Sequence, residues 1–217
     1  PDVRRMLLQM KAYVEGMRSL LYYIAFCADK IRISENEEEK AKYEGIIDLL
    51  IPIGKGYVTD RAFDVCHMGM QVYGGYGYIK DYPMEQLLRD CRISQIYEGT
   101  NGIQAMDLLG RKLGMNKGKP IMDLLGEVQK TIAAAKSASN LKAPAAKVEA
   151  AVNKLGETAL HIGQTAMSPD TRLVAFAHAY SFMEVFGDVV FAWLLLWRAS
   201  IAAQNLDNGA RKKDAGF

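Results

Sequence analysis

The stretch that decides the fold runs from Gln71 to Gln104 and holds two glycine-rich turns joined by a short amphipathic segment. The first turn reads Gln71-Val-Tyr-Gly74-Gly75-Tyr-Gly77-Tyr78, and the second reads Ile96-Tyr97-Glu98-Gly99-Thr100-Asn101-Gly102-Ile103-Gln104. Glycine at three of four positions allows positive φ and lets another surface approach the backbone N–H groups closely. A helix C-cap followed by an ordinary turn has the same glycines, so both interpretations stay open.

Glu98 is the one acidic residue of the second turn, and it stands between Tyr97 and Gly99 at a break between two helical patterns. A carboxylate at such a break is free to project into a cleft, and Gly99 leaves room for a substrate. Thr100 and Asn101 add a hydroxyl, an amide and the N–H groups of a helix start, which suit anionic or carbonyl groups. This layout is typical of a positioned general base, although an exposed turn glutamate has the same local sequence.

The sequence before these turns predicts two helices. Apolar residues recur at spacings of three and four over residues 2–30, which predicts a first helix with one apolar stripe. Ser34-Glu-Asn-Glu37 has the pattern of a capping box and predicts the start of a second, long helix. Pro52, with glycines soon after it, predicts a bend near the middle of that helix, which then continues to Tyr73.

Helical patterns also follow the first turn. Pro83 suits the first position of a third helix, and Thr100 or Asn101 can cap a fourth. The segment 115–120 is short, basic and rich in Gly and Pro, which makes it the best linker candidate. Beyond it we predict three further helices, over residues 121–139, 145–167 and from the Ser168-Pro169-Asp170 cap to about Asn205.

These patterns contain no strand of usable length, so the predicted fold class is all-α. We expect a four-helix-bundle unit over residues 1–115, a smaller helical unit over 116–206 and a flexible tail over 207–217. The most apolar run, Val185–Trp197, is interrupted by Asp188. A membrane span needs about 20 apolar residues, so we interpret this run as a buried helix and expect no membrane span.

Composition excludes other classes of protein. The net charge of +2 over 217 residues is too small to indicate nucleic-acid binding. Cys27, Cys66 and Cys91 have no C-x-x-C spacing, which favours buried thiols in a reducing compartment over a disulfide framework. No secretory signal is visible, and the start at Pro1 suggests that something has been removed upstream.

Residues 1–114 resemble the C-terminal helical domain of the acyl-CoA dehydrogenases. The motifs that match that family in order and spacing are Gln71-x-x-Gly74-Gly75-x-Gly77-Tyr78, Tyr82-Pro83, Leu88-Arg89-Asp90 and Ile96-Tyr97-Glu98-Gly99-Thr100-Asn101-x-Ile103-Gln104. The resemblance is specific because two separate motifs and the distance between them agree.

The resemblance implies an FAD enzyme that converts an acyl-CoA thioester to the trans-2-enoyl-CoA in fatty acid β-oxidation. Glu98 matches the base that removes the α proton, while the flavin accepts the β hydrogen as hydride. Gly99 and Tyr97 match positions beside the bound thioester. The remaining matches are to segments that contact FAD, either within one subunit (Thr100, Asn101, Gly102) or across a subunit interface (Gln71, Val72, Tyr73, Gly74, Gly75).

The same resemblance implies partners and a location. Electrons would leave through an electron-transferring flavoprotein, and the enzyme would be a homo-oligomer, a dimer or a tetramer. The expected location is the cytoplasm of a bacterial-type cell, in preference to the mitochondrial matrix. No metal ligand set is implied.

The chain departs from the family pattern at one position and extends it at the C-terminal end. Ala105 stands where many members have an arginine, so any contact from that arginine is missing. The run Gly102–Lys112 resembles instead the subfamily with an appended C-terminal helical domain, which includes enzymes similar to 3-methylmercaptopropionyl-CoA dehydrogenase. The family's N-terminal helical and β domains are not in this sequence, so we expect the 217 residues alone to bind FAD weakly and not to turn over.

Two alternatives compete with this interpretation. A non-catalytic helical oligomerisation or scaffold module would use the apolar last helix as a packing face, with residues Phe182, Val185, Phe186, Val189, Trp193 and Trp197. A di-iron carboxylate protein would need two Glu-x-x-His pairs. Asp64-x-x-His67 is the only near match and has no second copy.

Overall fold

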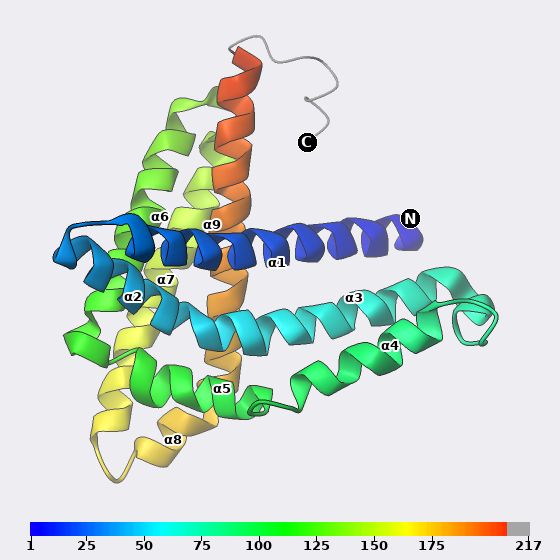
Figure 1. The fold of residues 1–217 in the computed structure, drawn as a ribbon, viewed down its shortest axis with the longest axis horizontal. Helices are drawn as coiled ribbons and strands as arrows, with labels where there is room; N and C mark the ends of the chain where they lie inside the picture. The colour runs from blue at the N-terminus through cyan, green and yellow to red at the C-terminus, as the bar shows by residue number, and fades with distance from the viewer. Residues whose placement is uncertain (208–217) are drawn as a thin grey trace.

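The computed structural model describes residues 1–207, which form an all-α fold without a strand, as predicted (Figure 1). One group of helices, from α1 to α4, runs across the molecule, and α6, α7 and α9 stand upright against it. The helices are α1 (Asp2–Ile33), α2 (Glu37–Pro52), α3 (Val58–Tyr73), α4 (Met84–Arg92), α5 (Asn101–Asp107), α6 (Lys119–Ser137), α7 (Lys142–Met167), α8 (Arg172–Ala177) and α9 (Ala179–Asp207).

The start of α2 differs from the predicted capping box. Asn36 is the N-cap, and its side-chain oxygen accepts the N–H groups of Glu38 at 2.8 Å and Glu39 at 3.3 Å. Ser34 lies outside the helix and donates its hydroxyl to the Glu39 carboxylate at 2.6 Å. The prediction was wrong because asparagine caps as well as serine and stands directly before the first helical residue.

The bend predicted at Pro52 is a widened turn. Pro52 ends α2, and residues Ile53–Tyr57 form a π-helical turn before α3 begins. A second π-helical turn, Leu108–Lys112, follows α5, and Leu113 N–H there donates to the carbonyl of Leu108 at 2.9 Å. Such turns interrupt the regular hydrogen-bond ladder and are frequent near functional sites.

The helices α3 and α4 form a hairpin that lies beside α1 and ends in the first glycine-rich turn (Figure 1). As predicted, α3 ends at Tyr73, and Gly74 follows with φ +62°. A Cβ on Gly77 would lie 2.4 Å from the carbonyl oxygen of Met70, so this position of the turn requires glycine.

The apolar face of the amphipathic segment between the two turns is partly exposed in α4. Leu87 and Ile96 are 49% and 48% exposed, whereas Leu88 and Cys91 are half-buried. The amphipathic pattern was real, but in this chain α4 packs on α3 alone along much of its length, so its outer apolar positions have no cover.

The predicted last helix is two helices in the structure. A break at His178 separates α8 from α9, and Phe182 N–H donates to the carbonyl of His178 at 2.9 Å as α9 begins. Asp207 ends α9, so the predicted flexible tail does not include it, and the rest of that tail lies outside the described residues.

The core is continuous through both predicted units. Trp193 of α9 is fully buried, packs edge-on against Tyr23 of α1 at 5.0 Å, and donates its indole N–H to Thr131 of α6 at 2.9 Å. Phe182, Phe186 and Val189 are also buried, so most of the proposed oligomerisation face of α9 packs inside this chain. The division near residue 115 stays a prediction.

Within the described residues, α9 is the one helix long and apolar enough to cross a membrane by length and composition. Half of its most apolar window is buried inside the fold, where it contacts α1, α6 and α7. The core helix of a folded domain has the same length and composition, so the apolar character of α9 is accounted for by its packing.

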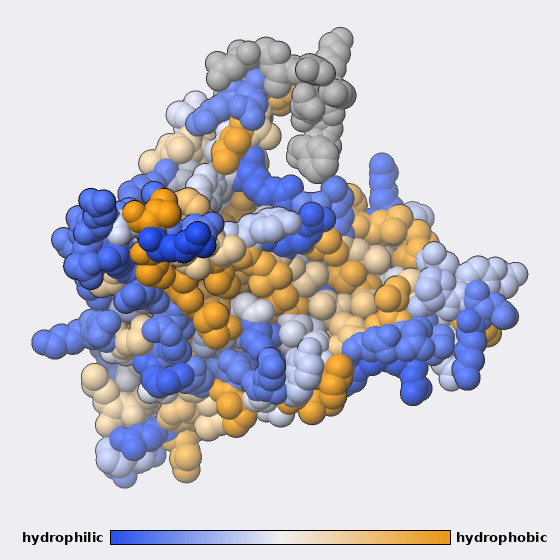
Figure 2. Space-filling view, viewed as in Figure 1, coloured by the Kyte–Doolittle hydropathy of each residue, from blue (hydrophilic) through white to orange (hydrophobic). Residues whose placement is uncertain are grey.

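Part of the surface is apolar. Figure 2 shows hydrophobic surface gathered between α1 and α3, and Leu7, Leu8 and Leu21 of α1 are exposed.

The three cysteines are free thiols. Cys27 is buried, and Cys66 and Cys91 are half-buried. Burial raises the pKa of Cys27 and of Cys66 to about 11, so both remain protonated at neutral pH.

Candidate active site

The second glycine-rich turn, residues 96–100, carries Glu98, and we call it the base turn. Glu98 and Gly99 both have left-handed backbone, with φ +53° and +85°. A non-glycine residue held in this region costs on the order of 1–3 kcal/mol, so the surrounding structure must stabilise it. Glu98 and Tyr97 are exposed, and the carbonyl of Glu98 accepts the side-chain amide of Gln104 at 3.4 Å.

Asp60 of α3 holds both ends of the base turn. One oxygen, Oδ1, accepts the side-chain amide of Gln95 at 2.5 Å and the side-chain amide of Asn101 at 2.7 Å. Gln95 precedes Glu98 by three positions and Asn101 follows it by three. The second oxygen, Oδ2, accepts the hydroxyl of Tyr180 from α9. Asp60 is 8% exposed, so these protein partners take the place of solvent.

Lys55 makes a further attachment to the base turn. Its ammonium donates to the carbonyl of Gly99 at 2.6 Å and to the side-chain oxygen of Asn101 at 2.8 Å. Burial lowers the pKa of Lys55, while the nearby Asp60 and Glu98 carboxylates oppose that effect. The turn that carries the candidate base therefore also has a cation fixed against its backbone.

Asn101 is buried with its side chain fully engaged. Besides Asp60 and Lys55, its amide contacts the carbonyl of Gly56 at 3.0 Å and the hydroxyl of Thr59 at 2.9 Å. The resemblance assigns Asn101 to FAD, but its 5% exposed side chain has no free donor or acceptor, so only its backbone is left for such a contact.

The other two residues of that segment are open to a ligand. Thr100 occupies the N-cap position of α5 without a side-chain cap hydrogen bond, and both Thr100 and Gly102 are exposed. Their hydroxyl and bare backbone stand at the start of α5, next to the base turn.

The first glycine-rich turn presents bare backbone. A Cβ added to Gly74 or Gly75 would meet nothing within 4 Å. Gln71 and Tyr73 are exposed beside it and Val72 is half-buried. The rings of Tyr73 and Tyr76 pack on Tyr82, with centroids 6.1 and 5.1 Å apart. An unobstructed strip of backbone therefore borders an aromatic cluster.

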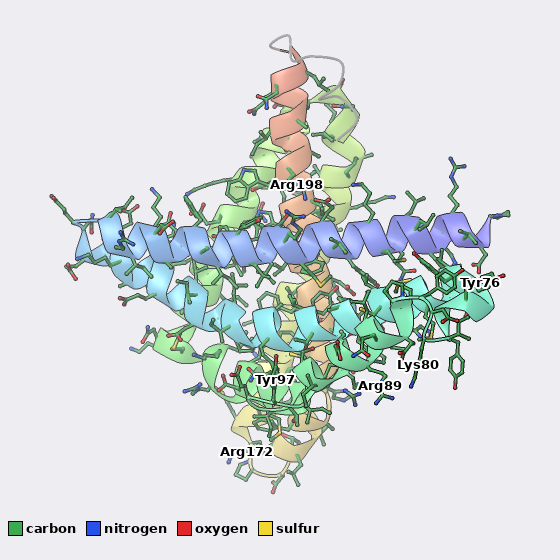
Figure 3. All side chains as sticks on the ribbon, turned by 45° about the vertical axis from the view of Figure 1, so that its right-hand side comes forward. Tyr76, Lys80, Arg89, Tyr97, Arg172 and Arg198 are labelled. Atoms are coloured by element: carbon green, nitrogen blue, oxygen red, sulfur yellow. The ribbon has the colours of Figure 1, made fainter. Side chains whose placement is uncertain are left out.

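The structure does not bring the two turns together within one chain. Figure 3 shows Tyr97 of the base turn near one end of α4 and Tyr76 and Lys80 beyond its other end. The nine residues of α4 alone correspond to about 14 Å of helix. Within one chain the two turns therefore stand at opposite ends of α4.

A polar stripe on α9 fixes α3 and the π-turn that precedes it. Tyr180 donates to Asp60, Glu184 accepts Arg61 at 2.6 Å, and Asp188 accepts the hydroxyl of Tyr57. The three α9 residues are spaced by four and so lie on one helical face. Burial raises the pKa of Glu184 to about 7, and the neighbouring Arg61 charge opposes that rise.

Sequence patterns did not single out Lys55, Asp60, Gln95 or Tyr180. Their partners are distant in the sequence, so no local spacing marks them. Asp64, the one acidic residue considered for a metal site, pairs with Arg61 at 3.2 Å. Within residues 1–207, no three potential metal ligands lie close together.

Comparison with known proteins identifies the family. The model of the acyl-CoA dehydrogenase C-terminal domain matches residues 1–113. A second model, described as acetyl-CoA dehydrogenase C-terminal like, matches residues 124–217. The chain belongs to the acyl-CoA dehydrogenase family, and it corresponds to the helical C-terminal part of that class of protein.

Within the family, two relatives confirm the predicted subfamily. The chain is 31% identical over 222 residues to the broad-specificity linear acyl-CoA dehydrogenase FadE5 of Mycobacterium tuberculosis. It is 36% identical over 226 residues to 3-methylmercaptopropionyl-CoA dehydrogenase of Ruegeria pomeroyi. Each alignment covers all of this chain but only 36% of the relative, so the chain spans about a third of their length.

A solved structure supports the fold. The crystal structure of Caenorhabditis elegans ACDH-11 in complex with C11-CoA has a TM-score of 0.81 and 22% sequence identity to this chain. The match covers 98% of this chain and 34% of that one. The appended helices α6 to α9 therefore belong to an arrangement that a solved member also has.

Proposed function

We propose that this chain is the C-terminal part of an FAD-dependent acyl-CoA dehydrogenase, which oxidises an acyl-CoA thioester to the trans-2-enoyl-CoA. The base turn carries the proposal. Its Glu98 carboxylate is exposed and stands on left-handed backbone, and the residues on either side of the turn, Gln95 and Asn101, both donate to the buried Asp60. Strained backbone that the surroundings hold in place is concentrated at functional sites. The names of the relatives support an acyl-CoA as the class of substrate.

In this proposal Glu98 takes the proton from the carbon α to the thioester carbonyl. Removal of that proton leaves negative charge on the thioester, which hydrogen-bond donors and the fixed cation of Lys55 would favour. Gly99 and Tyr97 lie beside Glu98, where Gly99 leaves room for the thioester. Bound FAD would accept the β hydrogen as hydride. Closure of the site over Glu98 would desolvate the carboxylate and make it a stronger base.

The residues present fit part of an FAD site. A Cβ on Gly74 or Gly75 would have no neighbour within 4 Å, so a dinucleotide could approach their backbone directly. Gln71, Val72 and Tyr73 would border it from one copy, while Thr100, Gly102 and the Asn101 backbone would border it from the other. The chain would hold the cofactor at its edges, and we expect weak FAD binding and no turnover from these 217 residues alone.

The proposal includes partners and a location. We propose that a second copy brings the first glycine-rich turn to the cofactor held by the base turn, so that the enzyme is a homo-oligomer, a dimer or a tetramer. The exposed apolar residues of α1 suit contact with a further protein surface. Electrons would pass from the reduced cofactor to an electron-transferring flavoprotein, in fatty acid β-oxidation in the cytoplasm.

The test is a Glu98→Gln substitution in the complete enzyme. FAD should stay bound, and the loss of flavin absorbance on adding acyl-CoA should slow by about 100-fold or more, because a positioned base contributes that much. Glu44→Gln on the exposed face of α2 is the matched control and should bleach at the wild-type rate.

Two results would contradict the proposal. Bleaching of Glu98→Gln at the wild-type rate would remove Glu98 from the reaction. FAD-loaded wild-type enzyme that no acyl-CoA bleaches would favour the alternative, a non-catalytic helical oligomerisation or scaffold module.

A further inference from the structure

We propose that Tyr180, on the appended helix α9, is a positioning residue for the base turn and acts on it through Asp60. The inference rests on the proposed function of Glu98 and extends it to a helix that carries none of the family's site motifs. It gives the appended region a role in the reaction, in addition to its role in packing.

Asp60 connects the two elements. Its Oδ1 holds Gln95 and Asn101, the residues on either side of the base turn, and its Oδ2 holds Tyr180. A buried carboxylate can rotate about its last side-chain bond unless both oxygens are occupied. The Tyr180 hydroxyl therefore fixes the plane of the carboxylate and thereby the positions of both amides.

Removing the Tyr180 hydroxyl would leave Oδ2 as a buried acceptor without a partner, which is costly. The Asp60 carboxylate would turn so that Gln95 or Asn101 could bond to the vacated oxygen. Either change moves one end of the base turn relative to the other, because Lys55 holds only the Gly99–Asn101 end. Glu98 lies midway between these ends, so its direction changes most.

The left-handed backbone at Glu98 makes the turn sensitive to this change. Strain of this kind persists only where the surroundings hold both sides of the residue. A displacement of about 1 Å at a reacting group is enough to slow a reaction by about 100-fold. A hydroxyl on α9 that touches neither substrate nor cofactor can therefore affect the rate of proton transfer.

The Tyr180 hydroxyl must keep its proton in order to donate to Asp60. Burial raises its pKa, and the hydrogen bond to the Asp60 carboxylate raises it further. The hydroxyl therefore keeps its proton and remains a donor throughout the neutral range. The nearby Glu184 and Arg61 charges pair with each other and leave the Asp60 oxygens to the three donors described above.

The experiment is Tyr180→Phe in the complete FAD-loaded enzyme, because this substitution removes only the hydroxyl. The bleaching rate at saturating acyl-CoA should fall about tenfold, since one hydrogen bond to a charged group is lost. FAD content and KM should be unchanged. The isotope effect measured with α-deuterated acyl-CoA should rise, because proton removal becomes more fully rate-limiting.

Thr131→Val is the matched control. It removes another buried hydrogen bond to α9, the one that Thr131 of α6 accepts from Trp193, and neither residue contacts the base turn or Asp60. This variant should unfold at a lower temperature and keep the wild-type bleaching rate and isotope effect. Equal losses of rate in Thr131→Val and Tyr180→Phe would overturn the inference, since general loosening of α9 would then explain both.

A wild-type bleaching rate in folded Tyr180→Phe would also overturn it. If that variant does not fold, Gln95→Met decides, because it removes one of the other two donors to Asp60 without touching α9. The inference requires the same fall in rate. Glu98→Gln separates the two proposals. If Glu98→Gln is inactive while Tyr180→Phe is fully active, only the positioning role fails.

Discussion

At the scale of single residues, Glu184 is a partly buried carboxylate with only one oxygen engaged. Its Oε2 accepts Arg61, while Oε1 is buried and has no partner in the described part of the chain. Burial therefore dominates and raises the pKa of Glu184 from 4.5 to about 7, against the opposing charge of Arg61.

This shift predicts a pH dependence of stability. Between about pH 4.5 and 7 the folded chain keeps a proton on Glu184 that the unfolded chain has released, so Glu184 lowers stability as pH rises through that window. Glu184→Gln has no such proton to lose. In thermal unfolding measured at a series of pH values, the unfolding temperature of Glu184→Gln minus that of wild type should increase as the pH is raised from about 4.5 to 7. A difference that stays constant or falls would show that the carboxylate is not buried as described.

Glu98 could be proposed as a candidate base from the sequence because its motif is local, whereas the residues that hold its turn could not be predicted. Asp60 and Asn101 are 41 positions apart, and Asp60 and Tyr180 are 120 apart. No spacing within one helix reveals such a pairing. The resemblance assigns Asn101 to the cofactor, but only the structure reveals that its side-chain amide is used inside the protein.

At the scale of elements, the helical glycines are of two kinds, and close helix contacts depend on only one of them. A Cβ on Gly187 of α9 would lie 2.2 Å from the ring of Tyr57, which is fully buried and cannot move aside. A Cβ on Gly126 of α6 would meet nothing within 4 Å. The first glycine allows packing between elements, and the second is simply a weak helix former.

We therefore predict opposite effects for the same change. Gly187→Ala should lower the free energy of unfolding by about 2 kcal/mol or more through overpacking. Gly126→Ala should raise it by about 0.5–1 kcal/mol through helix propensity. Denaturant unfolding of both variants checks this pair of signs. Stabilisation by Gly187→Ala would mean that α9 does not approach Tyr57 so closely.

Most helices could be predicted because their apolar residues repeat with the helical period. The π-turns at Ile53–Tyr57 and Leu108–Lys112 and the break at His178 could not. Each depends on how the flanking helices pack, and a single inserted residue changes the period too little to be seen. The exposure of the apolar face of α4 could not be predicted for a related reason, because periodicity identifies an apolar face but does not say what covers it.

At the scale of the whole molecule, one core joins the two segments that the family models match separately. Ile132 of α6 is 1% exposed and belongs to the same buried cluster as Leu20 of α1 and Trp193 of α9. A shared core of this kind favours cooperative unfolding of both segments.

We predict a single unfolding transition for residues 1–217. Circular dichroism reports all helices, whereas fluorescence reports Trp193 and Trp197, both on α9. The two signals should coincide, and Ile132→Ala should shift both together by about 2–5 kcal/mol. An earlier loss of helix that leaves the tryptophan signal unchanged would indicate two independent units.

The central claim is that Glu98 removes the α proton, and hydrogen exchange at that carbon tests it without relying on the flavin signal. Complete FAD-loaded enzyme is incubated with acyl-CoA in D₂O without an electron acceptor, and the recovered thioester is analysed by mass spectrometry. Wild type should incorporate deuterium at the α carbon, and Glu98→Gln should do so at least about 100-fold more slowly. Equal incorporation by the two proteins would contradict the account.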